Sequence, residues 1–190
     1  RKLYQRNEVE ISFTLKQSWD EKSPVLAMKR TFPEGETLLE MVSDIMRVID
    51  KGRSGKSSAS SDFEVNMAAK LPRVVTAGIV QMLKSLDVAG LLPGALIKGD
   101  PLYASLFVAN LGSLGLEAGF HHLYEYGNIP IFMTIGRVTP TPVVVDGEVA
   151  IRPVMKLRYT YDERIEDGFA AARALGTLQT YLEDPERLLR

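Results

Sequence analysis

The segment Tyr161-Asp162-Glu163-Arg164-Ile165-Glu166-Asp167-Gly168 joins two different periodic patterns. Before it, apolar and polar residues alternate from Met155 to Tyr161, which is typical of a strand with one buried face. After it, apolar residues recur at steps of four, three and four, at Ala171, Leu175, Leu178 and Leu182. This spacing predicts a helix that ends at Asp184-Pro185. An acidic loop is therefore expected between a strand and the N-terminus of a helix.

The first fifty residues predict a strand pair followed by a helix. Alternation from Glu8 to Lys16 predicts a half-buried strand, and Val25 to Phe32 is its expected partner. Thr37 and Glu40 form a capping-box pair ahead of an apolar stripe that runs to about Gly52.

The middle of the chain is punctuated by polar and turn-forming segments. Residues 52–61 are mostly serine, glycine and lysine, and this composition predicts a mobile loop. We expect helices over Phe63–Lys70 and Pro72–Leu86, and a loop from Gly90 to Pro101. Strands are expected from Ile131 to Val138 and on either side of Asp146-Gly147, which is a strong hairpin signal. This order predicts an α+β fold, with a mixed sheet packed against helices in one domain over residues 1–190.

Two motifs resemble the catalytic domain of the 2-oxoacid dehydrogenase acyltransferases and the related chloramphenicol acetyltransferase. The family pattern Asp-His-Arg-x-x-Asp-Gly is matched by residues 162–168, except that Glu163 stands where the family has histidine. The run Phe107-Val108-Ala109-Asn110-Leu111-Gly112-Ser113-Leu114-Gly115 resembles the family's Ser-Asn-Leu-Gly-x-x-Gly turn. The likeness is specific from Leu106 to the end, moderate over residues 8–52 and weak over residues 63–100.

The resemblance implies a chloramphenicol-acetyltransferase-like two-layer sandwich that transfers an acyl group. The donor would be a coenzyme A or lipoyl thioester acting as co-substrate, the acceptor would be a small molecule, and no cofactor would be bound permanently. The family also implies a homotrimer with its active site at the subunit boundary. A helix and a strand precede the matching region in the family, so we expect that an N-terminal segment is missing from this chain.

In the family, the loop histidine is the general base, and Glu163 is its candidate replacement. The reference pKa of glutamate is about 4.3 and that of histidine about 6.5, so proton transfer from a thiol costs about 3 kcal/mol more. Neighbouring carboxylates, including Asp167, would raise the pKa of Glu163 and recover part of this. The alternative is structural: Asp167 caps the helix or holds an arginine, Gly168 permits the turn, and Glu163 is idle. Asp162 and Arg164 are the remaining motif residues.

The other candidate site residues are less well matched. The family's oxyanion-stabilising hydroxyl falls where this chain has Glu117-Ala118-Gly119-Phe120, so Ser113 is the nearest substitute, although it suits local backbone bonding better. Asn110, His121 and His122 are candidate substrate-binding residues, and either histidine is a possible displaced base. The two adjacent histidines have no evident third ligand, so they do not predict a metal site.

Composition limits the remaining classes of function. The chain has 23 basic and 24 acidic residues and no basic block, which argues against nucleic acid or an anionic membrane as partner. It has no cysteine and no apolar run long enough to span a bilayer, which favours a cytoplasmic protein. Two alternatives to an active acyltransferase stay open: a non-catalytic trimeric scaffold, and a small-molecule-binding protein derived from the same fold.

Overall fold

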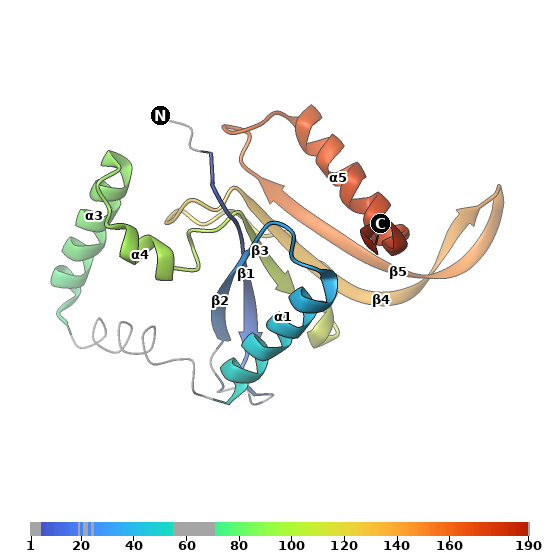
Figure 1. Cartoon of the computed structure of the whole chain (residues 1–190), viewed down its shortest axis with the longest axis horizontal. Helices are drawn as coiled ribbons and strands as arrows, with labels where there is room; N and C mark the ends of the chain where they lie inside the picture. Colours follow the sequence, from blue (N-terminus) through green and yellow to red (C-terminus); the bar gives the residue numbers. More distant parts are fainter. Residues whose placement is uncertain (1–4, 19, 21–22, 24, 55–70, 190) are drawn as a thin grey trace.

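The computed structural model describes residues 5–18, 20, 23, 25–54 and 71–189. Its centre is a five-stranded mixed sheet in the order β2-β1-β3-β4-β5. The strands are β1 (Val9–Lys16), β2 (Val25–Phe32), β3 (Leu106–Asn110), β4 (Ile131–Val145) and β5 (Glu148–Tyr161). β1, β3 and β4 run parallel, whereas β2 and β5 are antiparallel partners at the two edges (Figure 1). The mixed sheet confirms the predicted α+β class.

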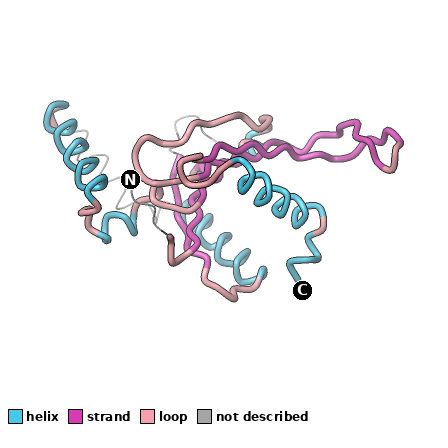
Figure 2. Tube along the Cα trace, turned by 90° about the horizontal axis from the view of Figure 1, so that it is seen from above, coloured by secondary structure: helices cyan, strands magenta, loops and turns pink. Residues whose placement is uncertain are grey.

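The helices are α1 (Leu38–Arg53), α3 (Arg73–Ala89), α4 (Gly94–Gly99) and α5 (Gly168–Glu183), with the 3₁₀ segments η1 (Gly112–Leu114) and η2 (Pro185–Leu189). α1 and α5 lie on one side of the sheet (Figure 2). The predicted capping box is present, since Glu40 N–H donates to Thr37 Oγ1 and the Glu40 carboxylate accepts from Thr37 N–H. Sheet and helices therefore form the predicted two layers.

The main cluster of buried apolar residues lies on the other face of the sheet. Phe107 of β3 and Phe132 of β4 are register partners whose rings stack at 5.0 Å, and they pack with Ala104 and Ile129. The buried Ser12 on the same face is satisfied by the covering loop, because its Oγ donates to the Pro101 carbonyl at 2.6 Å. Residues 101–130 thus close the face that carries no long helix.

Three sequence predictions need correction or fall outside the described residues. Gly52 and Arg53 belong to α1 rather than to the predicted mobile loop, because Gly52 lacks a side chain and lets the helix end approach Leu15. Residues 55–61 and the predicted helix Phe63–Lys70 lie outside the described residues. The predicted loop Gly90–Pro101 contains the short helix α4, which starts after Pro93. The helix predicted at Pro72–Leu86 is α3, and Gly90 ends it in the left-handed conformation.

β4 and β5 continue beyond the sheet as a long two-stranded ribbon, residues 138–155, which we call the hairpin arm (Figures 1 and 2). Its turn is the predicted Asp146-Gly147, and both residues have positive φ. Val149 and Ile151 are about three-quarters exposed, at 76% and 74%. These apolar side chains therefore lack a covering layer in the single chain. A two-stranded ribbon alone is also only marginally stable in water.

Within the described residues, no helix is both long enough and apolar enough to cross a membrane.

We predict that Gly112→Ala destabilises the turn after β3. A Cβ at residue 112 would lie 2.5 Å from the Gly136 carbonyl oxygen, and because both partners are backbone, neither can rotate away. The expected loss is about 1–3 kcal/mol in the free energy of unfolding, measured by urea denaturation. Gly78→Ala is the control: a Cβ there meets no atom within 4 Å inside α3, so it should stabilise by about 0.5–1 kcal/mol. Equal denaturation midpoints for Gly112→Ala and wild type would contradict this close packing.

Candidate functional site

The acidic loop starts where β5 ends, and its shape is held by Asp162. The Asp162 carboxylate accepts from the Arg164 backbone N–H at 3.0 Å and from Arg164 Nε at 2.6 Å, and it also pairs with Arg164 Nη2. The backbone N–H of Asp162 donates to the Pro130 carbonyl at 2.9 Å, which ties the loop to the segment before β4. The hydrogen bonds that Arg164 donates to Asp162, together with the negative charge of that carboxylate, raise the pKa of Arg164. These contacts give Asp162 and Arg164 the loop-shaping role expected of motif residues.

Asp167 is the N-cap of α5. Its Oδ1 accepts from the backbone N–H groups of Phe169 at 3.1 Å and Ala170 at 3.0 Å. These are two of the donors that a helix N-terminus leaves unsatisfied, and a negative charge there also complements the helix dipole. A Cβ on Gly168 would lie 3.3 Å from the Tyr161 hydroxyl, so a small residue suits this turn. The geometry supports the capping alternative for Asp167 rather than a chemical role.

Glu163 is exposed and is bonded by a neighbouring tyrosine. The Tyr161 hydroxyl donates to Glu163 Oε1 at 3.2 Å. Loss of hydration raises the pKa of Tyr161, and the hydrogen bond and charge of Glu163 raise it further, so the phenol stays protonated as a donor. Sequence reasoning did not single out Tyr161, although strand alternation places it two residues before Glu163. One carboxylate oxygen of Glu163 is thus oriented, and Oε2 is left for another partner.

Asn110 and Ser113 hold the turn that follows β3. The Ser113 backbone N–H donates to Asn110 Oδ1 at 3.0 Å, and Ser113 Oγ donates to the Asn110 carbonyl at 2.7 Å. This confirms that the Ser113 hydroxyl satisfies the local backbone. A role in stabilising an oxyanion would require that hydroxyl to leave its carbonyl partner.

The register of β4 separates these two groups. Asn110 pairs with Ile135 of β4, whereas Tyr161 pairs with Ile131. Partners in register share a face, and four residues of strand span about 13 Å. The Asn110–Ser113 turn and the acidic loop therefore belong to the same face but to opposite ends of the short segment of β4 that pairs with β3. Within one copy they do not form a single catalytic crevice.

The histidines belong to the other face of the sheet. The His121 ring stacks on Phe132 with centroids 3.9 Å apart, and its carbonyl accepts from Thr160 Oγ1 at 2.5 Å. Thr160 precedes Tyr161 on β5, and successive strand residues point to opposite faces. The expectation that a histidine serves as a displaced base beside Glu163 therefore finds no support. No group of three potential metal ligands occurs among the residues that the structure describes.

The second half of the chain is similar in sequence to known acyltransferase components. Residues 97–190 match the family model of the 2-oxoacid dehydrogenases acyltransferase (catalytic domain). The dihydrolipoyllysine-residue acetyltransferase component of the pyruvate dehydrogenase complex of Bacillus subtilis is 34% identical over 96 residues, which cover 50% of this chain and 21% of that protein. The dihydrolipoyllysine-residue succinyltransferase component of the 2-oxoglutarate dehydrogenase complex of Bartonella vinsonii subsp. berkhoffii is 53% identical over 47 residues, or 25% of this chain and 11% of that protein. The matched part thus spans about a fifth or less of either relative's length.

Solved structures match nearly the whole chain. The dihydrolipoamide acetyltransferase of Azotobacter vinelandii, studied for the roles of a serine, a histidine and an asparagine in its catalytic mechanism, superposes with a TM-score of 0.63 at 19% identity. That match covers 100% of this chain and 60% of the other. A probable dihydrolipoamide acetyltransferase from Listeria monocytogenes 4b F2365 gives 0.61 at 15% identity, with 96% and 58% covered. The chloramphenicol-acetyltransferase-like fold predicted from the motifs is confirmed.

We predict that Asp167→Asn keeps the stability of the wild type and that Asp167→Ala loses about 1 kcal/mol. Asparagine can still accept from the first N–H groups of α5, whereas alanine leaves them without that partner. Urea denaturation followed by far-UV circular dichroism measures both variants. A large loss of stability in Asp167→Asn would show that the negative charge, and not the cap, holds this position.

Proposed function

Residues 97–190 belong to the catalytic-domain family of the 2-oxoacid dehydrogenase acyltransferases, and on that premise we propose that this protein transfers an acyl group from a thioester to a small acceptor. The donor is a coenzyme A or lipoyl thioester, bound as a co-substrate and not as a resident cofactor. The family match and the match between residues 162–168 and the family's catalytic motif support this proposal. Glu163 occupies the position of the base.

The histidine and asparagine studied in the Azotobacter enzyme lie four residues apart, as Glu163 and Asp167 do. In our proposal the Glu163 carboxylate takes the proton of an acceptor thiol or hydroxyl. The acceptor then attacks the acyl carbon, and the tetrahedral intermediate collapses to release the donor thiolate. The Tyr161 hydroxyl orients Oε1, so that Oε2 meets the acceptor. Because glutamate is about 2 pKa units weaker as a base than histidine, this step is slower by up to about 100-fold.

The complete site requires a second copy of the chain. Glu163 follows one end of the sheet, whereas Asn110 and Ser113 lie about 13 Å away along β4, at the other end. A head-to-tail contact brings the acidic-loop end of one subunit to the Asn110 end of the next, and such a heterologous contact closes into a ring. A homotrimer is the smallest such ring. The core of the pyruvate dehydrogenase multienzyme complex, a cubic assembly, matches this fold with a TM-score of 0.61.

The apolar surface of the single chain supports the same assembly. Val149 and Ile151 on the hairpin arm are largely exposed. α3 also carries Val74, Val75 and Ile79 in the exposed state. In a homotrimer, neighbouring copies would cover part of this surface. The balanced charge and the lack of cysteine favour a small-molecule substrate in the cytoplasm, without nucleic acid or membrane.

One observation favours a second candidate, a non-catalytic scaffold with the same fold. The Ser113 hydroxyl is bonded to the Asn110 carbonyl, and no serine or threonine stands within Glu117-Ala118-Gly119-Phe120. A protein that only assembles would tolerate both the missing histidine and the missing hydroxyl donor.

We predict that Glu163→Gln lowers kcat/KM for acetyl transfer from acetyl-CoA to small thiols by about 100-fold or more, because the amide cannot accept a proton. Glu166→Gln is the matched control in the same loop and should change kcat/KM by no more than about twofold. Glu163→His should have a higher kcat/KM than the wild type, since histidine is the stronger base. If the wild type turns over and Glu163→Gln does so equally well, Glu163 is not the base. No turnover in the wild type or in Glu163→His would favour the scaffold.

We also predict a solution mass of about 63 kDa by light scattering, three times the 21.1 kDa of one chain. Ile151→Asp should dissociate the trimer, because it places a charge on the exposed apolar arm without touching the core of its own subunit. Val25→Asp, at a residue that is 62% exposed at the start of β2 and belongs to neither the arm nor α3, is the control and should leave the mass unchanged. A monomeric wild type at micromolar concentration would contradict the shared site.

A further inference from the structure

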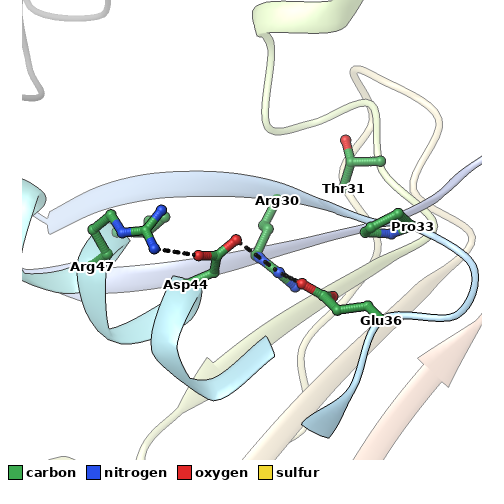
Figure 3. A pocket seen from close by; sticks show the side chains of 7 residues that line it. Arg30, Thr31, Pro33, Glu36, Asp44 and Arg47 are labelled. Atoms are coloured by element: carbon green, nitrogen blue, oxygen red, sulfur yellow. Dashed lines mark hydrogen bonds and ion pairs between the residues drawn. The ribbon is translucent and has the colours of Figure 1, made fainter. Parts of the chain in front are cut away.

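A hollow of about 430 Å³ lies between the end of β2 and α1, away from the acidic loop. Its charged lining consists of Arg30, Glu36, Asp44 and Arg47 (Figure 3). A second hollow of about 600 Å³ adjoins it, shares Glu36, Asp44 and Arg47, and adds Glu34 and Glu40. Together they form one groove beside the β2–α1 turn, with charged side chains set among apolar ones.

The four charged side chains of the first hollow alternate in sign. Arg47 Nη2 bonds Asp44 Oδ1 at 2.8 Å, Asp44 Oδ2 lies 3.4 Å from Arg30 Nη2, and Arg30 Nη2 also bonds Glu36 Oε1 (Figure 3). The Arg30 side chain is 8% exposed and that of Arg47 is 77% exposed. The groove therefore has a buried end, where Arg30 pairs with the 11% exposed Glu36, and an open rim at Arg47.

Arg30 is incompletely satisfied. Its Nη1 atom is buried and has no hydrogen-bond partner in the described part of the chain. The Arg30 guanidinium lies over the Phe32 ring, with its Cζ atom 4.4 Å from the ring centre. This contact attracts the cation but gives its N–H groups no hydrogen-bond acceptor. A buried donor without an acceptor costs about 1–3 kcal/mol. The guanidinium must rotate to bring Nη1 to the surface of the groove, and an acceptor oxygen there would then remove this cost.

The charge of the lining decides what kind of ligand carries that oxygen. Two guanidinium groups face four carboxylates, those of Glu34, Glu36, Glu40 and Asp44, so the groove is net negative. A simple anion would gain at Arg30 but would be repelled by the rim. The groove also offers free acceptor atoms. In the described structure only Oε1 of Glu36 and only Oε2 of Glu40 take part in hydrogen bonds, so the other carboxylate oxygen of each residue can accept one from a ligand.

We propose that this groove binds an amino acid with a basic side chain. Its carboxylate accepts from Arg30 Nη1 and Arg47, and its ammonium groups donate to Glu36 and Glu40. This site is independent of acyl transfer, since it uses β2 and α1 and none of the residues of the acidic loop.

Isothermal titration of the full chain tests the proposal with lysine, alanine, acetate and 1,4-diaminobutane. We expect lysine to bind with a Kd of about 1 mM or tighter. Alanine should bind at least threefold more weakly, and acetate and the diamine at least tenfold more weakly, because each has only part of the required charge. Failure of lysine to bind, or equal binding of acetate or of the diamine, would overturn the proposal.

Three variants locate the binding. Glu40→Gln keeps the capping box, in which glutamine also serves, but removes a rim charge, so it should weaken lysine at least fivefold and alanine much less. Arg30→Lys should weaken both amino acids. Glu148→Gln, in the turn region of the hairpin arm, is the control. If Arg30→Lys does not fold by circular dichroism, Arg47→Gln replaces it. Unchanged lysine affinity in Glu40→Gln and in the arginine variant would overturn the site, whatever the acyl-transfer assay shows.

Discussion

The pairing of β4 with both β3 and β5 is the constraint on which the rest of the structure depends. Through β3 it stacks Phe132 on Phe107 and so forms the centre of the core. Through β5 it sets where the acidic loop emerges and how far the hairpin arm projects. A shift of one residue in this register would exchange the two faces of β4, and it would move the core residue Phe132 to the helix side. The positions of core, loop and arm therefore depend on one strand register.

The sequence predicted the elements that carry their own local signals. The Thr37–Glu40 capping box, the Asp146-Gly147 turn and the helical stripe of α5 all appeared where expected, because each depends on neighbours within a few residues. α4 was missed because a helix of six residues shows less than two full turns of periodicity. The end of α1 was misplaced because glycine at residue 52 signals a break locally, whereas its contact with Leu15 is tertiary.

The candidate site was predictable in part for the same reason. Motif spacing located residues 162–168 and the capping role of Asp167. It could not show that Asn110 pairs with β4 four residues away from the partner of Tyr161, since that separation is a matter of strand register. Nor did any spacing point to the ion pairs of Arg30. The only sequence signal was that Arg30 follows Leu26 and Met28 on the inward face of β2, where a charged residue needs a partner.

The loop explains how a glutamate can stand at the position of a catalytic histidine without disturbing the fold. Its shape is held by Asp162 with Arg164 and by Asp167 with the first N–H groups of α5. None of these bonds involves the side chain of residue 163, whose one hydrogen bond in the described structure comes from Tyr161 at its own end of β5. Glutamate in place of histidine at residue 163 therefore changes the proton affinity of that side chain and leaves the loop's own hydrogen bonds intact. The fold therefore places little demand on the side chain of residue 163, which is compatible both with the proposed base and with a scaffold that has lost the chemistry.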